Sequence, residues 1–439
     1  MLDRKRLVFS ALFGAILLAA TLAGLEFLSS FVTPAWPARA LVSREPAPVR
    51  VLGTPYERQP WLAEPDNSWG MRDRERTIAK LQGTSRAVFV GDSFVESRFT
   101  PLSLPAAVEQ QLPKEAKIET INLAVGGTDP RSYYYRIRDV ALALHPDAVL
   151  LFIYAGNDFV APNQGYSIWP RLLDESPGGS VMGSIMPRTN WLLVNRLDLS
   201  EFLGSQSKAP PNATEILYAA ITAPPDERLK RLVAYVKTYH FPEVPEERIA
   251  EILSRGNNRF LDIALPHDGE QEYLLDSMVP PLISWETWNF KVPTTRQEAP
   301  QFAGDGKVEA TLSWIKATDR LLRSHGVPLL VFLAPVGSVD PDYADFWKPW
   351  PRPYSWNYIC EEMHARLATA LAKDGLRYVD LRENLANIPG TYRKLDGHWS
   401  QKGEAIVADR AALELRSLLR SPMISSQTKA GGSSLIPDR

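Results

Sequence analysis

The chain has 439 residues and a net charge of −2, from 49 basic and 51 acidic side chains. This balance provides no basic surface of the kind that nucleic-acid-binding proteins need, and the single cysteine, Cys360, excludes a disulfide framework within the chain. Hydrophobic residues make up 45% and charged residues 23%, which is ordinary for a globular protein with a hydrophobic core.

The N-terminal segment is basic and then apolar. Residues 4–6 are basic, and an uncharged apolar segment follows from Leu7 to Leu25, long enough as a helix to cross a hydrocarbon core of roughly 30 Å. We interpret residues 1–29 as a cytoplasmic stub and transmembrane anchor, in contact with the membrane through residues 7–28. The positive-inside rule then predicts a single-pass protein of the inner (cytoplasmic) membrane, with a cytoplasmic N-terminus and a periplasmic or extracellular globular part. A cleaved signal peptide is the alternative.

The two flanking segments are poor in periodic structure. Residues 30–83 are rich in proline and polar residues, and we expect a linker that packs onto the body, through Trp61 and Trp69. Residues 421–439 are rich in serine and glycine, which predicts a flexible tail.

A short apolar run and the polar residues after it mark the centre of the sequence. Ala87–Val90 is rich in branched and aromatic residues, which predicts a buried strand. Gly91, Asp92 and Ser93 follow at once, at the end of a strand where open α/β sheets bind their ligands. A serine exposed at a sharp strand-to-helix turn suits a nucleophile. The plain alternative is an ordinary turn, which all three residue types favour.

Helical and strand patterns then alternate along the chain, with one interruption. Before the interruption we expect helices at 104–111 and 130–144 and strands at 116–123 and 148–154. After it we expect helices at 308–324, 358–372 and 400–419 and strands at 327–333 and 376–381. Residues 161–305 show no sheet pattern, only helical stretches near 225–239 and 245–253. We interpret them as an insertion that covers the site as a lid or substrate wall.

Strands separated by helices specify an α/β fold with a parallel, doubly wound, three-layer sheet. We expect the flavodoxin-like strand order 2-1-3-4-5. Every loop at a carboxyl end of a strand then lies at one edge of the sheet, so Ser93, Gly127 and Asn157 can converge there.

A serine nucleophile needs a base, and the base needs an orienting group. His398 follows the last predicted strand and therefore lies at the same edge, and Asp396 is close enough to hold its imidazole. The other histidines are weaker candidates: His145 and His325 at helix ends, His364 within a helix, and His240 and His267 in the insertion.

Attack on an ester carbonyl also needs donors aimed at the developing oxyanion. The backbone N–H groups of Ser93 and Gly127 and the side-chain amide of Asn157 are the candidates. An ordinary β–α turn at Gly127 and an Asx turn at Asn157 are the plain alternatives for each residue taken alone. No metal or organic cofactor is expected.

Four blocks of sequence together resemble the SGNH, or GDSL, hydrolase superfamily. They are GDS at 91–93, NLAVGG at 122–127, GND at 156–158 and DGHW at 396–399. The family's Ser, Gly, Asn and His correspond here to Ser93, Gly127, Asn157 and His398. The resemblance implies a flavodoxin-like fold, ester hydrolysis or acyl transfer, and a hydrolase domain in two parts, 84–160 and 306–420, on either side of the insertion.

This chain departs from the family pattern at one position. Many members have Asp three residues before His, where this chain has Leu395. Asp396 stands two before, in an Asp-x-His-Trp form that resembles proteins of polysaccharide O-acetylation. This form raises the weight of an acylated envelope glycan or lipid as the substrate.

Aromatic residues crowd the loop after the fourth predicted strand, at the same edge of the sheet. Exposed rings there would suit stacking against sugars, and the candidates are Trp347, Trp350, Tyr354 and Trp356. The alternative is that they pack the insertion against the body. Three functions remain open: an esterase acting on acyl, especially acetyl, esters; an O-acyltransferase with a membrane acyltransferase partner; and a catalytically silent binding protein.

Overall fold

The computed structural model describes residues 4–31, 50–51, 54–55, 67, 69, 71–97, 99–162, 186, 188–189, 192, 223–256, 279, 281–288, 291–394 and 397–420. At its centre is a sheet of five strands: β3 (Ser85–Val90), β4 (Ile118–Asn122), β5 (Ala148–Tyr154), β6 (Leu329–Ala334) and β7 (Tyr378–Asp380). Neighbouring strands are all parallel and run in the order β4-β3-β5-β6-β7. The predicted doubly wound sheet and its 2-1-3-4-5 order are therefore confirmed.

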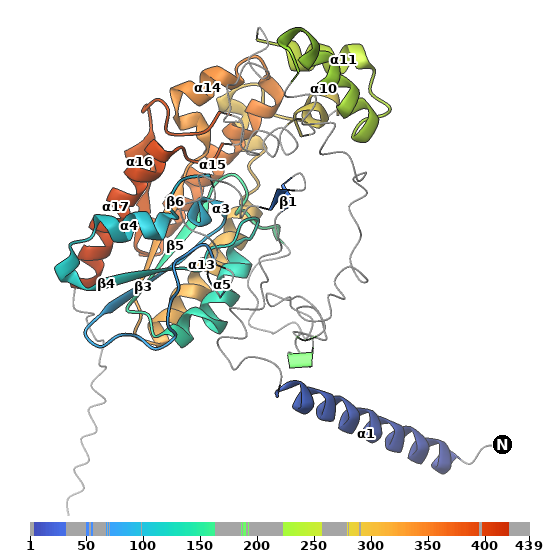
Figure 1. The fold of residues 1–439 in the computed structure, drawn as a ribbon, viewed down its shortest axis with the longest axis vertical. Helices are drawn as coiled ribbons and strands as arrows, with labels where there is room; N and C mark the ends of the chain where they lie inside the picture. Colours follow the sequence, from blue (N-terminus) through green and yellow to red (C-terminus); the bar gives the residue numbers. More distant parts are fainter. Residues whose placement is uncertain are drawn as a thin grey trace, which may run out of the picture.

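Helices cover both faces of the sheet and make three layers (Figure 1). On one face are α4 (Leu104–Gln111), α16 (Arg382–Leu385) and α17 (Gln401–Arg420). On the other are α5 (Pro130–Asp139), α13 (Asp305–Ser324) and α15 (Pro351–Lys373). Alternate strand residues point to opposite layers, so Ala87 and Phe89 pack with the first set and Val88 and Val90 with the second. Burial on both faces explains why the strands are nearly continuous apolar runs.

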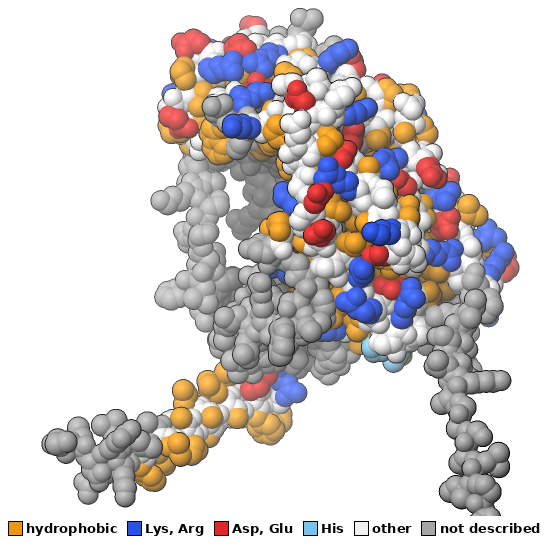
Figure 2. Space-filling model, turned by 180° about the vertical axis from the view of Figure 1, so that it is seen from behind, with side chains coloured by type: hydrophobic (Ala, Val, Ile, Leu, Met, Phe, Trp, Pro, Cys, Tyr) orange, Lys and Arg blue, Asp and Glu red, His pale blue; other side chains and the backbone are white. Residues whose placement is uncertain are grey.

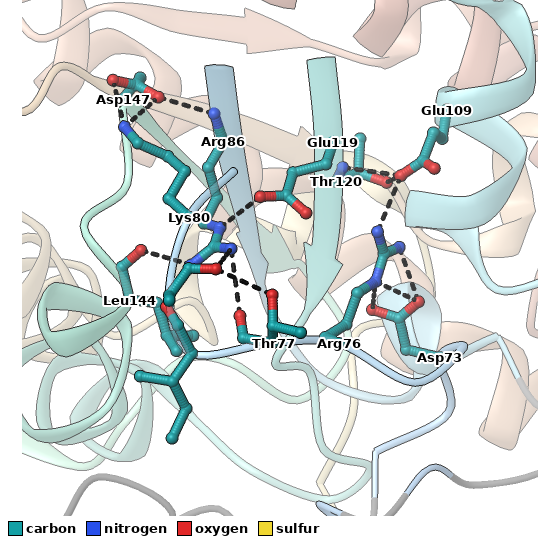
Figure 3. A network of polar contacts seen from close by, with 12 residues as sticks. Asp73, Arg76, Thr77, Lys80, Arg86, Glu109, Glu119, Thr120, Leu144 and Asp147 are labelled. Carbon is teal, nitrogen blue, oxygen red and sulfur yellow. Dashed lines mark hydrogen bonds and ion pairs between the residues drawn. The ribbon is translucent and has the colours of Figure 1, made fainter. Parts of the chain in front are cut away.

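Carboxylates cover the outer edge of β4, which is an edge strand. The backbone N–H of Thr120 donates to Glu109 Oε2 (2.8 Å), and that of Asn122 donates to Asp73 Oδ2 (3.1 Å). Arg76 bridges the two acids, with distances of 2.7 Å to Asp73 and 3.2 Å to Glu109 (Figure 3). This arrangement satisfies donors that would otherwise offer an open edge to another strand.

A buried arginine holds the segment before β3 against the amino end of the sheet. Arg86, at the start of β3, is fully buried and pairs with Glu119 at 2.6 Å. Its guanidinium also donates to the carbonyls of Ile78 (2.9 Å) and Leu144 (2.7 Å) (Figure 3). Residues just before β3 are thus part of the folded body. Trp69 is buried in the core, whereas Trp61 lies outside the described residues.

A second hydrophobic core lies beyond the carboxyl edge of the sheet. It joins α10 (Pro225–Tyr239) and α11 (Glu246–Ser254), both within the predicted insertion, to α14 (Pro341–Trp347), which follows β6. Figure 1 shows this helical region beyond one end of the sheet. It is the end at which β3 is followed by α3 (Ser93–Glu96). The insertion therefore packs on a loop that belongs to the edge where the site residues were predicted.

The N-terminal helix α1 (Arg4–Ser29) stands away from the body, and its apolar side chains face outward (Figures 1 and 2). The window Leu12–Ser29 has a mean hydropathy of 1.9 and is only 6% buried. The helix is long and apolar enough to cross a membrane, a property that signal sequences share. Near its end, Glu26 accepts hydrogen bonds from the backbone of Arg188 (2.9 Å) and Thr189 (3.0 Å).

Two helix boundaries differ from the prediction by more than one helical turn. The helix expected at 130–144 ends at Asp139, because Val140 leaves helical geometry, and a 3₁₀ turn, η3 (Ala141–Leu144), follows. The helix expected from 358 begins at Pro351, since proline is favoured in a first helical turn. The remaining short elements are β1 (Arg50–Val51), β2 (Thr54–Pro55), η2 (Lys114–Ala116), η5 (Arg296–Gln301) and η6 (Gly337–Val339).

Candidate active site

Ser93 is the first residue of the short helix α3, directly after the turn that ends β3. A side chain at Gly91 would meet Val95 Cγ2 at 2.6 Å, so only glycine fits at this turn. Asp92 caps α3, and its Oδ1 accepts a hydrogen bond from the backbone N–H of Phe94 at 3.0 Å. These local contacts place the Ser93 hydroxyl at the carboxyl edge of the sheet.

His398 lies on the returning side of a small hairpin after β7. Tyr392 and Trp399 form an antiparallel bridge, and Arg393 N–H donates to the carbonyl of His398 at 2.8 Å. Fully buried Asp340 anchors the hairpin to the loop after β6, because its Oδ2 accepts from the Tyr392 N–H at 2.8 Å. Gly397, at φ 71°, supplies the left-handed geometry just before His398.

The two side chains meet. His398 Nε2 lies 2.7 Å from Ser93 Oγ, although 305 residues separate them in the chain. The imidazole stacks on Phe94, with ring centres 4.8 Å apart, and Phe99 lies on another side at 5.0 Å. Aromatic contacts thus fix the plane of the imidazole, and both polar side chains remain half-buried.

Gly127 lies beside this pair, in the turn after β4. Its φ is 72°, it is exposed, and no described atom lies within 4 Å of the position that a Cβ would occupy. The preceding Gly126 packs closely on the serine: a Cβ added there would lie 3.5 Å from Ser93 Cβ. The glycine turn therefore borders open space next to the Ser93 side chain.

Asn157 follows β5 and lies next to the acid that precedes the serine. Asp92 is fully buried, and burial raises the pKa of its carboxyl group. The Phe94 N–H, the nearby His398 and the Asn157 side chain oppose this rise. The Asp92 carboxyl group therefore interacts electrostatically with His398 and through a hydrogen bond with the Asn157 side chain. Asn157 itself is exposed.

A second buried carboxyl group, Asp158, fixes the loop that carries Asn157. Its oxygens accept hydrogen bonds from the Tyr133 hydroxyl (2.8 Å) and the Tyr154 N–H (2.7 Å). Burial and the neighbouring Asp92 raise the pKa of Asp158 well above its usual range. Buried hydrogen bonds to Asp158 thus fix the loop after β5, and Asn157 lies on the exposed side of this loop.

Asp396, the predicted orienting acid, lies outside the described residues, as does His267. The remaining described histidines have other positions or partners. His145 and His325 end helices, His240 contacts Tyr235, and His364 pairs with Asp380 at 2.9 Å. Only His398 is hydrogen-bonded to Ser93 among the described histidines.

The expected sugar-stacking role is wrong for two of the four aromatic residues. Trp350 is fully buried and donates from Nε1 to the carbonyl of Ile252 in α11 (2.8 Å). Trp347 is 4% exposed and donates to the carbonyl of Lys394 (2.8 Å). Both rings belong to the second core and join the insertion to the body. Burial there removes their large apolar faces from water.

The other two aromatic residues are partly buried. Trp356 packs against the main core and lies 6.0 Å from Trp285. Tyr354 packs against the second core, and burial, with a smaller effect of Tyr358, raises its pKa to about 12. Their substrate-binding role stays a prediction.

Two buried residues near the site were not among the predicted site residues. Glu96 lies three positions after Ser93, and its Oε2 accepts from the Gly126 N–H at 2.8 Å. Arg72 lies in the segment predicted as linker, and its guanidinium donates to the carbonyls of Glu96 (3.2 Å) and Thr100 (2.5 Å). A charged residue directly after the apolar pair Phe94 and Val95 was the one available signal for Glu96.

Comparison with known proteins gives distant structural likeness alone. No family model and no curated protein matches the sequence. A protein from Bacteroides fragilis described as an acylhydrolase aligns at a TM-score of 0.32, and a GDSL-like lipase from Bacteroides thetaiotaomicron at 0.30. Each is 10% identical, and each alignment covers 77% of this chain and 90% of the other. At these scores the likeness carries no argument, so the chemistry is inferred from the geometry of the site.

Proposed function

We propose that this protein is a serine ester hydrolase of the SGNH type. The observation that supports this function most strongly is the 2.7 Å contact between Ser93 Oγ and His398 Nε2 at the carboxyl edge of the sheet. A hydroxyl hydrogen-bonded to an imidazole is the arrangement that activates serine for nucleophilic attack.

In the proposed reaction, Ser93 Oγ attacks the acyl carbonyl while His398 Nε2 accepts the hydroxyl proton. The tetrahedral intermediate collapses to an acyl-Ser93 ester, and His398 returns the proton to the departing alcohol. Water or a sugar hydroxyl then attacks the acyl group while His398 accepts its proton. The second tetrahedral intermediate breaks the bond to Ser93 Oγ and releases the acid or the acylated sugar, and His398 returns the proton to Ser93 Oγ. Because Nε2 faces Ser93, Nδ1 is the atom that Asp396 would hold, which is its proposed role.

The proposed oxyanion site consists of the N–H groups of Ser93 and Gly127 and the side-chain amide of Asn157. Gly127 is exposed beside open space, and the turn that contains it packs on Ser93. Asn157 lies next to Asp92, the residue before Ser93. Donors fixed in this way stabilise the charge that develops on the carbonyl oxygen.

We propose that α1 anchors the enzyme in the cytoplasmic membrane, with the catalytic part in the periplasm or outside the cell. The apolar window Leu12–Ser29 and the basic residues before it support this orientation. The proposed substrate is then an acyl ester, especially acetyl, of an envelope glycan or lipid. Transfer to a glycan acceptor, with a membrane acyltransferase as the partner, is the variant of this chemistry that the experiment must distinguish.

The test uses the full-length protein in detergent micelles and a chromogenic acetate ester. Wild-type protein should release the chromophore, and Ser93→Ala should release it only at the background rate. Adding an oligosaccharide acceptor and following acyl groups by mass spectrometry distinguishes transfer from hydrolysis. Equal rates for wild type and Ser93→Ala would exclude Ser93 as the nucleophile, and background rates for both would leave a binding protein.

A further inference from the structure

A buried carboxylate connects the helix that carries Ser93 to the glycine turn. Glu96 is only 4% exposed, and its Oε2 accepts a hydrogen bond from the Gly126 N–H at 2.8 Å. Glu96 and Ser93 are both in α3, one at each end. Burying a carboxylate costs free energy unless it is hydrogen-bonded. The bond from the Gly126 N–H offsets this cost, which an apolar side chain would not have.

The backbone of the helix that carries Glu96 is itself fixed. Arg72 is 1% exposed and donates to the carbonyls of Glu96 (3.2 Å) and Thr100 (2.5 Å), at the end of α3. The N–H of Ser97 donates to the carbonyl of Ser93 at 2.9 Å and closes the same turn. The helix therefore cannot shift without breaking buried hydrogen bonds.

Hydrogen bonds hold the glycine turn, and the bond from the Gly126 N–H to Glu96 is one of them. The Val125 N–H donates to the Gly91 carbonyl at 3.1 Å, and the Thr128 hydroxyl donates to the Val125 carbonyl at 2.5 Å. Between them, Gly126 and Gly127 have no side chains of their own to pack. The Gly126 N–H is the group through which α3 can set the position of the turn.

We propose that Glu96 is a positioning residue that holds the Gly126–Gly127 turn, so that the Gly127 N–H points at the oxyanion formed by attack of Ser93. The inference rests on the proposed ester hydrolysis and adds a residue to its machinery. Glu96 touches neither substrate nor reacting atoms. It acts through the backbone of Gly126, which lies against Ser93.

The first test compares Glu96→Gln with Glu96→Met in the full-length enzyme. Glutamine can still accept from the Gly126 N–H, whereas methionine has similar length and no such acceptor. Misplacing a donor at the site can cost about 10²-fold in rate, so Glu96→Met should lower kcat by about 10–10²-fold. KM should change by no more than about twofold, because the effect is confined to the transition state. Glu96→Gln should recover most of the lost kcat.

A second variant reaches the same contact from the other side. A Cβ at Gly126 would lie 2.8 Å from Glu96 Oε2, so Gly126→Ala should displace the carboxylate without altering Glu96. It should lower kcat as Glu96→Met does, and the two changes together should lower it little further, because both remove one interaction. This variant also serves if Glu96→Met does not fold.

Affinity for a boronic acid gives a readout that a structural role would not move. Phenylboronic acid forms a tetrahedral adduct with a serine and mimics the transition state. Its inhibition constant should rise across the variants in proportion to the loss of kcat/KM. Full activity of Glu96→Met, or equal losses in Glu96→Gln and Glu96→Met, would overturn the role of Glu96 alone. Wild-type protein without esterase activity or boronate binding would overturn the proposed function as well.

Discussion

The indole Nε1 of Trp347 donates a 2.8 Å hydrogen bond to the carbonyl of Lys394, in the hairpin that carries His398. The same indole packs in the core formed by α10 and α11. The insertion is thus connected to the histidine hairpin through one buried side chain. Trp350 donates a hydrogen bond of the same length, 2.8 Å, from its indole N–H. Its acceptor is the carbonyl of Ile252 in the insertion and not a residue of the hairpin. The two tryptophans therefore form a matched pair for testing this connection.

Replacing Trp347 by Phe should lower both stability and turnover. The lost hydrogen bond should reduce the free energy of unfolding by about 1 kcal/mol, and kcat should fall because His398 is less well positioned. Trp350→Phe should reduce stability to a similar extent and leave kcat near the wild-type value. Urea unfolding and ester turnover measure the two effects. Equal kcat values for the two variants would show that the insertion does not support the histidine hairpin.

The buried Arg76 should matter far more than the exposed Arg74, although both contact Glu109. Arg76 is 2% exposed and also pairs with Asp73, which is 1% exposed. Removing it by Arg76→Met takes away the charged partner of the buried Asp73 carboxylate and should cost about 3–5 kcal/mol of unfolding free energy. Arg74 is 56% exposed, and Arg74→Met should cost about 0–1 kcal/mol. Similar urea midpoints for the two variants would contradict the protection of the β4 edge by this network.

The fold was predictable because its strands are buried on both faces. The run Ala148–Tyr154 is apolar throughout and forms β5 with the expected limits. The end of α5 was not predictable, since Val140 leaves helical geometry in a sequence without proline or glycine at that point. Residues at the carboxyl ends of strands could be placed at one edge from topology alone, which is how Ser93 and His398 were found.

The rest of the site depends on contacts that sequence spacing does not reveal. Trp347 and Trp350 are buried by helices of the insertion, and nothing in an aromatic-rich loop distinguishes that packing from exposure to a substrate. The proposed positioning role of Glu96 depends on the Gly126 N–H, which lies 2.8 Å from its carboxylate in the fold and 30 residues away in the sequence. The role of Asp396 remains a prediction.

Acidification should destabilise the protein through His364. Burial lowers the pKa of this imidazole, and the hydrogen bond to Asp380 only partly opposes the shift. Between the lowered folded pKa and the unfolded value of about 6.5, the unfolded chain binds more protons, so stability falls as pH decreases below about 6.5. His364→Gln should flatten the dependence of unfolding free energy on pH between about 7 and 5. An unchanged slope, or wild-type stability that increases on acidification, would contradict this assignment.

Asn157→Ala should reduce turnover by removing one proposed oxyanion donor. Such a loss typically costs about 10²–10³ in kcat, and the exposed side chain also stabilises the buried Asp92 carboxylate. The free energy of unfolding should therefore fall by no more than one hydrogen bond is worth, about 1 kcal/mol, while kcat falls by far more. A variant with wild-type kcat would remove Asn157 from the proposed oxyanion site and leave only the two backbone donors.

Covalent trapping with a fluorophosphonate, followed by peptide mapping, tests the central claim most directly. Ser93 and His398 must act together, since their side chains are 2.7 Å apart. Full-length wild-type protein should gain one phosphonyl group, located on Ser93, and His398→Ala should react at least about 10²-fold more slowly. An adduct on another residue, or equal labelling of wild type and His398→Ala, would contradict an imidazole-activated serine at this site.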